Sequence, residues 1–139
     1  MKPKTTVTKG NIIKREWHLV DLKDQVLGRV CVEIAKILQG KDKPDYSPNR
    51  DAGDYVVAIN ADKIRVTGKK LTDKIYYNHT GYAGHLKELS LGQMMEKDSR
   101  LVIARGVKGM LPKNKLRDRR MTRLKIFVDS AHTYNDKIK

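Results

Sequence analysis

The chain has 139 residues, enough for one domain, and its 39% of apolar residues gather in short periodic runs that exclude wholesale disorder. Thirty Lys and Arg against sixteen Asp and Glu give a formal net charge of +14, which favours a polyanionic partner, either nucleic acid or an anionic membrane. No run of about 20 apolar residues exists, and no secretory or lipidation signal is visible, so we expect a cytosolic protein. Cys31 is the single cysteine, which excludes an internal disulfide and a cysteine-based zinc site.

The first half of the chain predicts a strand, a helix and a second strand. Residues 1–16 read as a basic arm, and the apolar run at 17–21 is typical of a buried strand. Apolar residues at helical spacing over 27–39, followed by Gly40, predict an amphipathic helix that ends at the glycine. The continuous apolar run at 55–59 is typical of a strand covered on both faces, so the order suggests a right-handed parallel crossover.

The second half predicts shorter elements. Alternation over 63–67 favours a strand, and 74–77 favours another. Weak helical patterns cover 89–97 and 101–110, and a strand-like apolar run closes the series at 124–128. These patterns together indicate the α/β class.

The surplus charge is concentrated in two segments. Residues 104–125 carry nine basic residues and one acidic residue, net +8, and residues 1–16 carry five and one, net +4. A block of one sign repels itself and weakens the compact state, so a bound polyanion accounts for it better than a solvated face does. We therefore expect residues 112–123 and the arm at 1–16 to be mobile without their bound polyanion.

Patterns that would indicate an enzyme are weak. Residues 68–70, Gly-Lys-Lys, lack both the earlier glycine and the following Ser or Thr of a phosphate loop. His79 and His85, with Asp73 near in sequence, leave a general acid/base pair open, but histidines that bond locally or meet phosphate are the simpler interpretation. We predict no catalytic residue, no metal site, no cofactor and no small-molecule substrate.

Several ordered motifs resemble one known family. In chain order they are Trp17 and Asp21 with Leu27-Gly28-Arg29, Gly40-Lys41-Asp42-Lys43-Pro44, Tyr46-Ser47-Pro48-Asn49, Asp51-Ala52-Gly53-Asp54-Tyr55, Asn60-Ala61-Asp62-Lys63-Ile64, Val66-Thr67-Gly68-Lys69, Asp73-Lys74-Ile75-Tyr76-Tyr77-Asn78-His79 and Val107-Lys108-Gly109-Met110-Leu111-Pro112-Lys113. The chain resembles, from about Trp17 to Val128, the bacterial form of the large-ribosomal-subunit protein family numbered thirteen. The glycine-proline motif at 107–113 is the most specific of the set.

The resemblance implies both a fold and a function. The implied fold is a three-layer α/β/α arrangement around a mainly parallel four-stranded sheet, with a single RNA-binding domain at 17–128 and a short tail at 129–139. The implied function is structural: binding to large-subunit ribosomal RNA beside neighbouring ribosomal proteins, early incorporation during subunit assembly, and no catalysis. Two other classes stay open, a free RNA-binding translational regulator and an α/β enzyme acting on a phosphorylated substrate.

The candidate RNA contacts are basic side chains, with the aromatic or glycine positions beside them. They are Lys41, Lys43, Tyr46, Lys69, Lys70, His79, Lys108, Gly109, Lys113, Lys115, Arg117, Arg119, Arg120 and Arg123. Lys and Arg neutralise phosphates and release counterions, and Arg adds bidentate contacts. We expect the four arginines of the 117–123 segment to be the leading contacts and to be dispensable for the fold.

Overall fold

The computed structural model describes residues 13–138 of the protein, so residues 1–12 of the basic arm expected at 1–16 lie outside this range. The elements are, in order, β1 (Trp17–Asp21), α1 (Leu27–Gln39), β2 (Tyr55–Ile59), the 3₁₀ turn η1 (Ala61–Lys63), α2 (Lys70–Asp73), β3 (Ile75–His79), β4 (Leu86–Ser90), α3 (Leu91–Met110), α4 (Leu116–Thr122) and β5 (Leu124–Ile126). The α/β class is confirmed, and β1, α1 and β2 have the predicted bounds.

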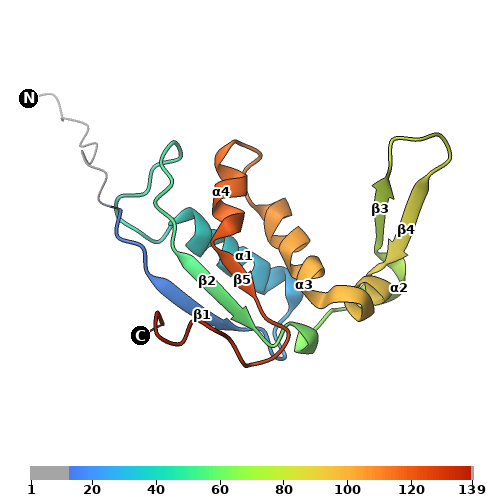
Figure 1. Ribbon diagram of the computed structural model, residues 1–139, viewed down its shortest axis with the longest axis horizontal. Coiled ribbons are helices and arrows are strands. Elements are labelled where there is room, and N and C mark those ends of the chain that lie inside the picture. Colours follow the sequence, from blue (N-terminus) through green and yellow to red (C-terminus); the bar gives the residue numbers. More distant parts are fainter. Residues whose placement is uncertain (1–12, 139) are drawn as a thin grey trace, which may run out of the picture.

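The strands form two separate sheets (Figure 1). Strands β1, β2 and β5 make a parallel sheet with β2 in the centre, while β3 and β4 form an antiparallel hairpin. The expected four-stranded parallel sheet is therefore wrong. The segment 63–67 continues from η1 and makes a single bridge, Arg65 to Val26, and the predicted strand near 74–77 pairs with β4 instead of joining the main sheet.

The helices pack on one face of the parallel sheet. The main core joins side chains of α1 and α3 to one face of β2 and β5. Its buried members include Leu22, Val30, Cys31, Ile34, Leu38, Val56, Ala58, Ile103 and Val107. On the opposite face, Trp17 and Tyr55 stack with ring centroids 4.3 Å apart, and Tyr134 of the C-terminal segment stacks on Trp17 at 5.0 Å. Irregular chain takes the place of the third layer, so the expected α/β/α sandwich is not formed.

Helix α1 owes its length to its sequence pattern and its end to Gly40. Val30, Ile34 and Leu38 fall on one face and are buried, as amphipathic spacing requires. Gly40 takes φ +73°, and its N–H donates to the carbonyls of Lys36 and Ile37, which closes the helix. Gly53 then passes so close that a Cβ there would lie 1.8 Å from the Leu38 carbonyl oxygen, so the loop packs on the helix end by backbone contact.

Helix α3 begins with a capping box and is broken once. The Ser90 hydroxyl accepts from the Gln93 N–H, and the Gln93 side chain accepts from the Ser90 N–H. Asp98 has extended dihedral angles, which divide the element near the boundary between the two predicted helices. The described residues contain no helix that is both long and apolar enough to cross a membrane.

Candidate nucleic-acid interface

Helix α4 is fastened to the loop after α1 by one carboxylate. The Asp51 carboxylate accepts from both terminal nitrogens of Arg123, at 2.7 and 2.6 Å, and lies 3.5 Å from Nε of Arg120 and 3.8 Å from the Arg15 guanidinium. Arg123 also donates to the Leu38 carbonyl at 3.1 Å. Three guanidinium groups therefore surround one carboxylate, and α4 is tied to the C-terminal end of α1.

The charge balance sets the state of Asp51. Burial of the carboxyl raises its pKa, but the hydrogen bonds from Arg123 and the charges of Arg123, Arg15 and Arg120 outweigh burial and hold the pKa below its ordinary value of 3.8. The Asp51 carboxylate is consequently ionised at neutral pH. A surplus of positive charge remains around it, and Nε and one terminal nitrogen of Arg120 have no hydrogen-bond partner in the structure.

A second carboxylate, Asp54, fixes the base of the same loop. It accepts from the Glu16 N–H at 3.0 Å, lies 3.2 Å from Nε2 of His18 and pairs with the Lys43 ammonium group. Burial raises the Asp54 pKa, but these hydrogen bonds, that of Lys43 first, lower it overall. The loop is therefore held at Asp51 and again at Asp54.

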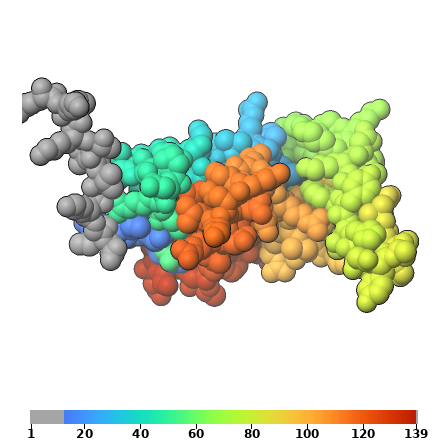
Figure 2. All heavy atoms as spheres, turned by 90° about the horizontal axis from the view of Figure 1, so that it is seen from above, coloured from blue at the N-terminus to red at the C-terminus, as the bar shows by residue number. Residues whose placement is uncertain are grey.

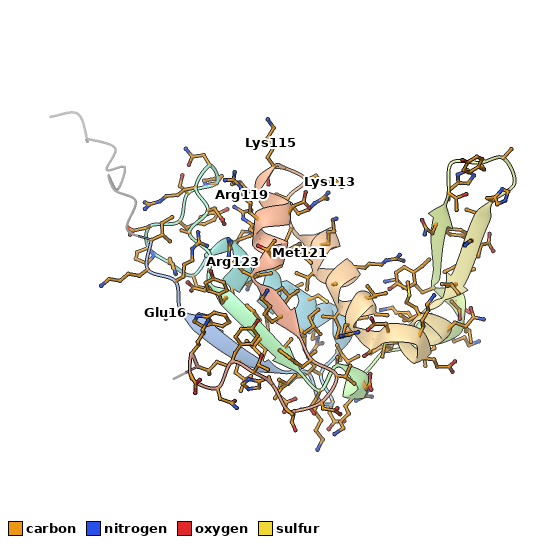
Figure 3. The ribbon with its side chains drawn as sticks, in the orientation of Figure 1. Glu16, Lys113, Lys115, Arg119, Met121 and Arg123 are labelled. Carbon is orange, nitrogen blue, oxygen red and sulfur yellow. The ribbon has the colours of Figure 1, made fainter. Side chains whose placement is uncertain are left out.

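These anchors bring the 40–50 loop and the 112–123 segment together, and space-filling shows the two side by side (Figure 2). We call this surface the basic end, and define it by its exposed or half-exposed cations: Lys41, Lys113, Lys115, Arg117 and Arg119. Lys113, Lys115 and Arg119 project from the top of α4 and its preceding turn (Figure 3). The acidic residues Asp42, Asp45 and Asp118 are also exposed there, so the surplus comes mainly from the α4 side.

The structure corrects the expectation for two of the four arginines. Arg120 is 1% exposed and Arg123 5% exposed, so both fill space beneath α4 and the fold depends on their pairing. Residues 116–122 form a helix that contacts α1, α3 and β5, so part of the segment expected to be mobile without RNA is a defined element of the fold. Of the loop cations, Lys43 is occupied by Asp54 and by the Lys14 carbonyl, whereas Lys41 is exposed.

The remaining candidates are distributed over the rest of the surface. Lys108 and Gly109 lie in the last turns of α3, ahead of the turn at Leu111, and Lys108 is 3.7 Å from Asp118. Gly109 has open space where a Cβ would project, so packing does not require a glycine there. Tyr46 in the first loop is half-buried.

Lys69 and Lys70 lie exposed at the start of α2, and His79 is exposed near the tip of the hairpin, where its Nδ1 accepts from the Gly81 N–H at 3.0 Å. The second histidine of the suspected acid/base pair, His85, bonds to the Ala83 carbonyl at 2.8 Å. Each imidazole therefore has a local backbone partner. Within residues 13–138, no three His, Cys, Asp or Glu side chains are grouped as metal ligands.

Sequence reasoning missed the residues that shape the basic end. Asp51 and Arg15 carry no local signal, because their partners lie up to 72 positions away in the chain. The signal that was available is the pair of acids, Asp51 and Asp54, directly before an apolar strand, together with an arginine-rich segment far along the chain. The aromatic tip residue Tyr82, 74% exposed, was also passed over.

The fold and the charge distribution define a basic α/β protein with a dense group of exposed cations on α4 and its preceding turn. The family model described as ribosomal protein L13 matches residues 15–133. A large ribosomal subunit protein uL13 from Pelobacter propionicus is 50% identical over 132 residues, covering 95% of this chain and 93% of the relative. The protein of the same name from Clostridioides difficile is 50% identical over 131 residues, which cover 94% of this chain and 92% of the relative. That from Acidithiobacillus ferrooxidans is 50% identical over 132 residues, which cover 95% of this chain and 93% of the relative.

The chain therefore belongs to the ribosomal protein L13 family, a family of structural, non-enzymatic proteins, and the expected resemblance is confirmed.

Proposed function

We propose that the protein is a constituent of the large ribosomal subunit that binds ribosomal RNA chiefly through its basic end and supports early subunit assembly in the cytoplasm. The relatives' name, large ribosomal subunit protein, supports the subunit. The observation that carries the binding surface is the cluster of exposed cations on α4, held in place by Asp51. Arg120 and Arg123 act beneath this surface, as the means of holding α4.

The proposed mechanism is electrostatic positioning. Each phosphate neutralised by a Lys or Arg side chain releases counterions, so the affinity falls as salt rises with a slope that counts the neutralised phosphates. A rigid helix presents its cations at fixed spacing and loses little conformational entropy on binding. Lys69, Lys70, His79, Lys108 and Gly109 would add contacts elsewhere around folded RNA, and neighbouring ribosomal proteins would cover other faces.

The experiment is to measure affinity for purified large-subunit ribosomal RNA against salt concentration. The test variant replaces Lys113, Lys115 and Arg119 with Ala, and its slope should fall by about one unit for each phosphate that is no longer neutralised. All three side chains are exposed, so the melting temperature should hold.

A matched control variant removes the same charge outside the basic end, by replacing with Ala the exposed Lys23 after β1, Lys63 in η1 and Lys97 in α3. Its slope should change less. Equal slopes for the two variants would assign the binding to net charge alone and overturn the basic end as the main surface. In cells, the test variant should sediment poorly with large-subunit particles, and normal particle profiles would argue against the assembly role.

A further inference from the structure

An apolar pocket of about 410 Å³ lies away from the basic end, between the first turns of α1, the segment 65–74 and α3. Its inner wall is formed by the buried Cys31, Leu91 and Val102, and Val66 and Tyr76 close its sides. The volume falls within the range of about 300–1,000 Å³ typical of small-ligand sites. The pocket is lined from several elements, so it is a feature of the tertiary fold.

The rim of this apolar pocket is basic. Arg65, Lys70 and Lys74 line it and are exposed, against one carboxylate, Asp73. The Lys74 ammonium lies 5.4 Å from the centroid of the Tyr76 ring, a cation–π distance that holds the lysine stem along the pocket wall. An apolar cavity with a cationic rim suits a ligand that joins a flat apolar part to an anionic group.

The start of α1 adds to the positive electrostatic potential at the pocket. The helix begins at the pocket, its N-cap residue Val26 offers no side-chain cap, and its first turn contains no acidic residue. The positive end of the helix dipole is therefore not compensated by the helix's own side chains. Gly28, in the same turn, lines the pocket and has nothing within 4 Å of where a Cβ would project, so the mouth stays open there.

We propose that this pocket receives one unstacked nucleotide of the bound RNA, with its base against the apolar wall and its phosphate on Arg65, Lys70 and Lys74. The inference rests on the proposed function, because RNA binding brings the nucleotide to the site. Splayed-out bases are a usual target of RNA-binding proteins, since a single-strand loop can lose one stack and regain it on the protein. The Asp73 carboxylate can accept a hydrogen bond from an exocyclic amine, so adenine, cytosine and guanine fit the rim better than uracil, which has none.

The first experiment titrates the full-length chain with adenosine 5′-monophosphate and follows backbone amide shifts by NMR. The amides of Gly28, Thr67 and Gly106, which line the pocket, should move, whereas that of Trp17 on the opposite sheet face should not. Adenosine and ribose 5-phosphate should each bind at least tenfold more weakly than the nucleotide, because each fills only one half of the site.

Two variants test the apolar wall that holds the base and the basic rim that holds the phosphate separately. Gly28→Leu extends a side chain into the open mouth at a position where helix propensity favours Leu, and it should weaken both the nucleotide and adenosine at least tenfold. Replacing Lys70 and Lys74 with Gln should weaken the nucleotide but leave adenosine unchanged. Val32→Leu, on the same helix and outside the pocket, is the matched control and should behave as the wild type.

Binding to ribosomal RNA then distinguishes the pocket proposal from the proposal that the basic end is the main RNA-binding surface. Gly28→Leu should lower RNA affinity severalfold and reduce the salt slope by no more than about one unit, because only the phosphate of the excluded nucleotide is no longer neutralised. An absence of nucleotide-induced shifts at the lining amides would overturn the pocket assignment while leaving a steep salt slope, and with it the proposed function, intact. Equal binding of N-acetyl-leucinamide and the nucleotide would also overturn it, since the pocket would then fit an apolar protein side chain.

Discussion

The two ends of the molecule are stabilised in different ways. At the basic end, exposed cations stand on a short helix that is locked by the buried pairing of Asp51 with Arg120 and Arg123. At the other end, the hairpin of β3 and β4 projects from the body and makes few contacts with it (Figure 1). Its exposed apolar side chains are Ile75, Tyr77, Tyr82 and Leu86.

The comparison shows that a high density of positive charge does not prevent a segment of this protein from being firmly packed. The segment with the densest positive charge is the one that the fold anchors with buried ion pairs. The nearly neutral hairpin is fixed mainly through Tyr76 and Leu89, which pack against the small cluster of Leu91, Met94 and Val102. A basic surface is therefore preorganised for an anion, whereas the hairpin keeps apolar groups in solvent.

The largest expected effect is on the ion pairs that Asp51 makes with Arg120 and Arg123. Asp51→Asn leaves the buried Arg120 and Arg123 without a counter-charge, and breaking a buried pair in this way costs about 3–5 kcal/mol of the free energy of unfolding. Urea unfolding measures the loss. Asp118→Asn is the matched control, because that carboxylate is exposed beside Lys108 and its removal should hardly change stability. Equal stabilities of the two variants would show that the basic end does not depend on Asp51.

The second prediction concerns local opening. A two-stranded hairpin without a covering layer is marginally stable, so the hydrogen-bonded amides of β3 should exchange at least about 100-fold faster than those of Val56 to Ala58 in the sheet centre. Amide hydrogen exchange of the free protein checks this ratio. The amides of α4 should exchange about as slowly as those of the sheet centre. If α4 exchanged as fast as the hairpin, the comparison would fail.

The third prediction is a pH dependence to which the carboxylates beside the basic end contribute. Asp51 and Asp54 both have lowered pKa values, so the stability that they contribute is fully present above the ordinary value of 3.8 and is lost as pH falls through their lower folded values. The wild type should lose stability in acid below about pH 4, and Asp51→Asn should flatten part of this loss. If the stability of the wild type and of Asp51→Asn fell in parallel as the pH is lowered, the contribution of Asp51 would be contradicted.

The smallest expected effect is at the hairpin tip. Tyr82→Ser removes a ring that is 74% exposed, so stability should stay within about 0.5 kcal/mol of the wild type. The salt slope of RNA binding should also be unchanged, because no charge is removed. A clear loss of stability in thermal unfolding would mean that the hairpin is folded against the body.

Sequence patterns predicted those parts of the fold whose stability is local or strongly periodic. The bounds of α1 follow from its apolar stripe and from Gly40, and those of β1 and β2 follow from short apolar runs. The strand expected at 63–67 is wrong, because alternation describes any extended segment and does not reveal whether a partner strand is near. The presence of β4 was missed, because its solvent-exposed residues carry no burial pattern.

The candidate site was predicted in part for the same reason. Charge density located the 104–125 segment, and the exposed Lys113, Lys115 and Arg119 agree with a contact surface. It did not distinguish cations that face solvent from Arg120 and Arg123, which are buried against Asp51. That distinction depends on a partner 72 residues away from Arg123, which no local window contains.

The central position of β2 has a consequence for biosynthesis. Its register joins Val57 to Leu19 on one side and to Lys125 on the other, so one edge of the central strand can be filled early and the other only after nearly the whole chain has left the ribosomal tunnel. Asp51 likewise waits for Arg123, which is made 72 codons later. The nascent chain therefore carries one unpaired edge of β2, and an Asp51 that lacks its partner Arg123, until the segment around residues 123–126 emerges.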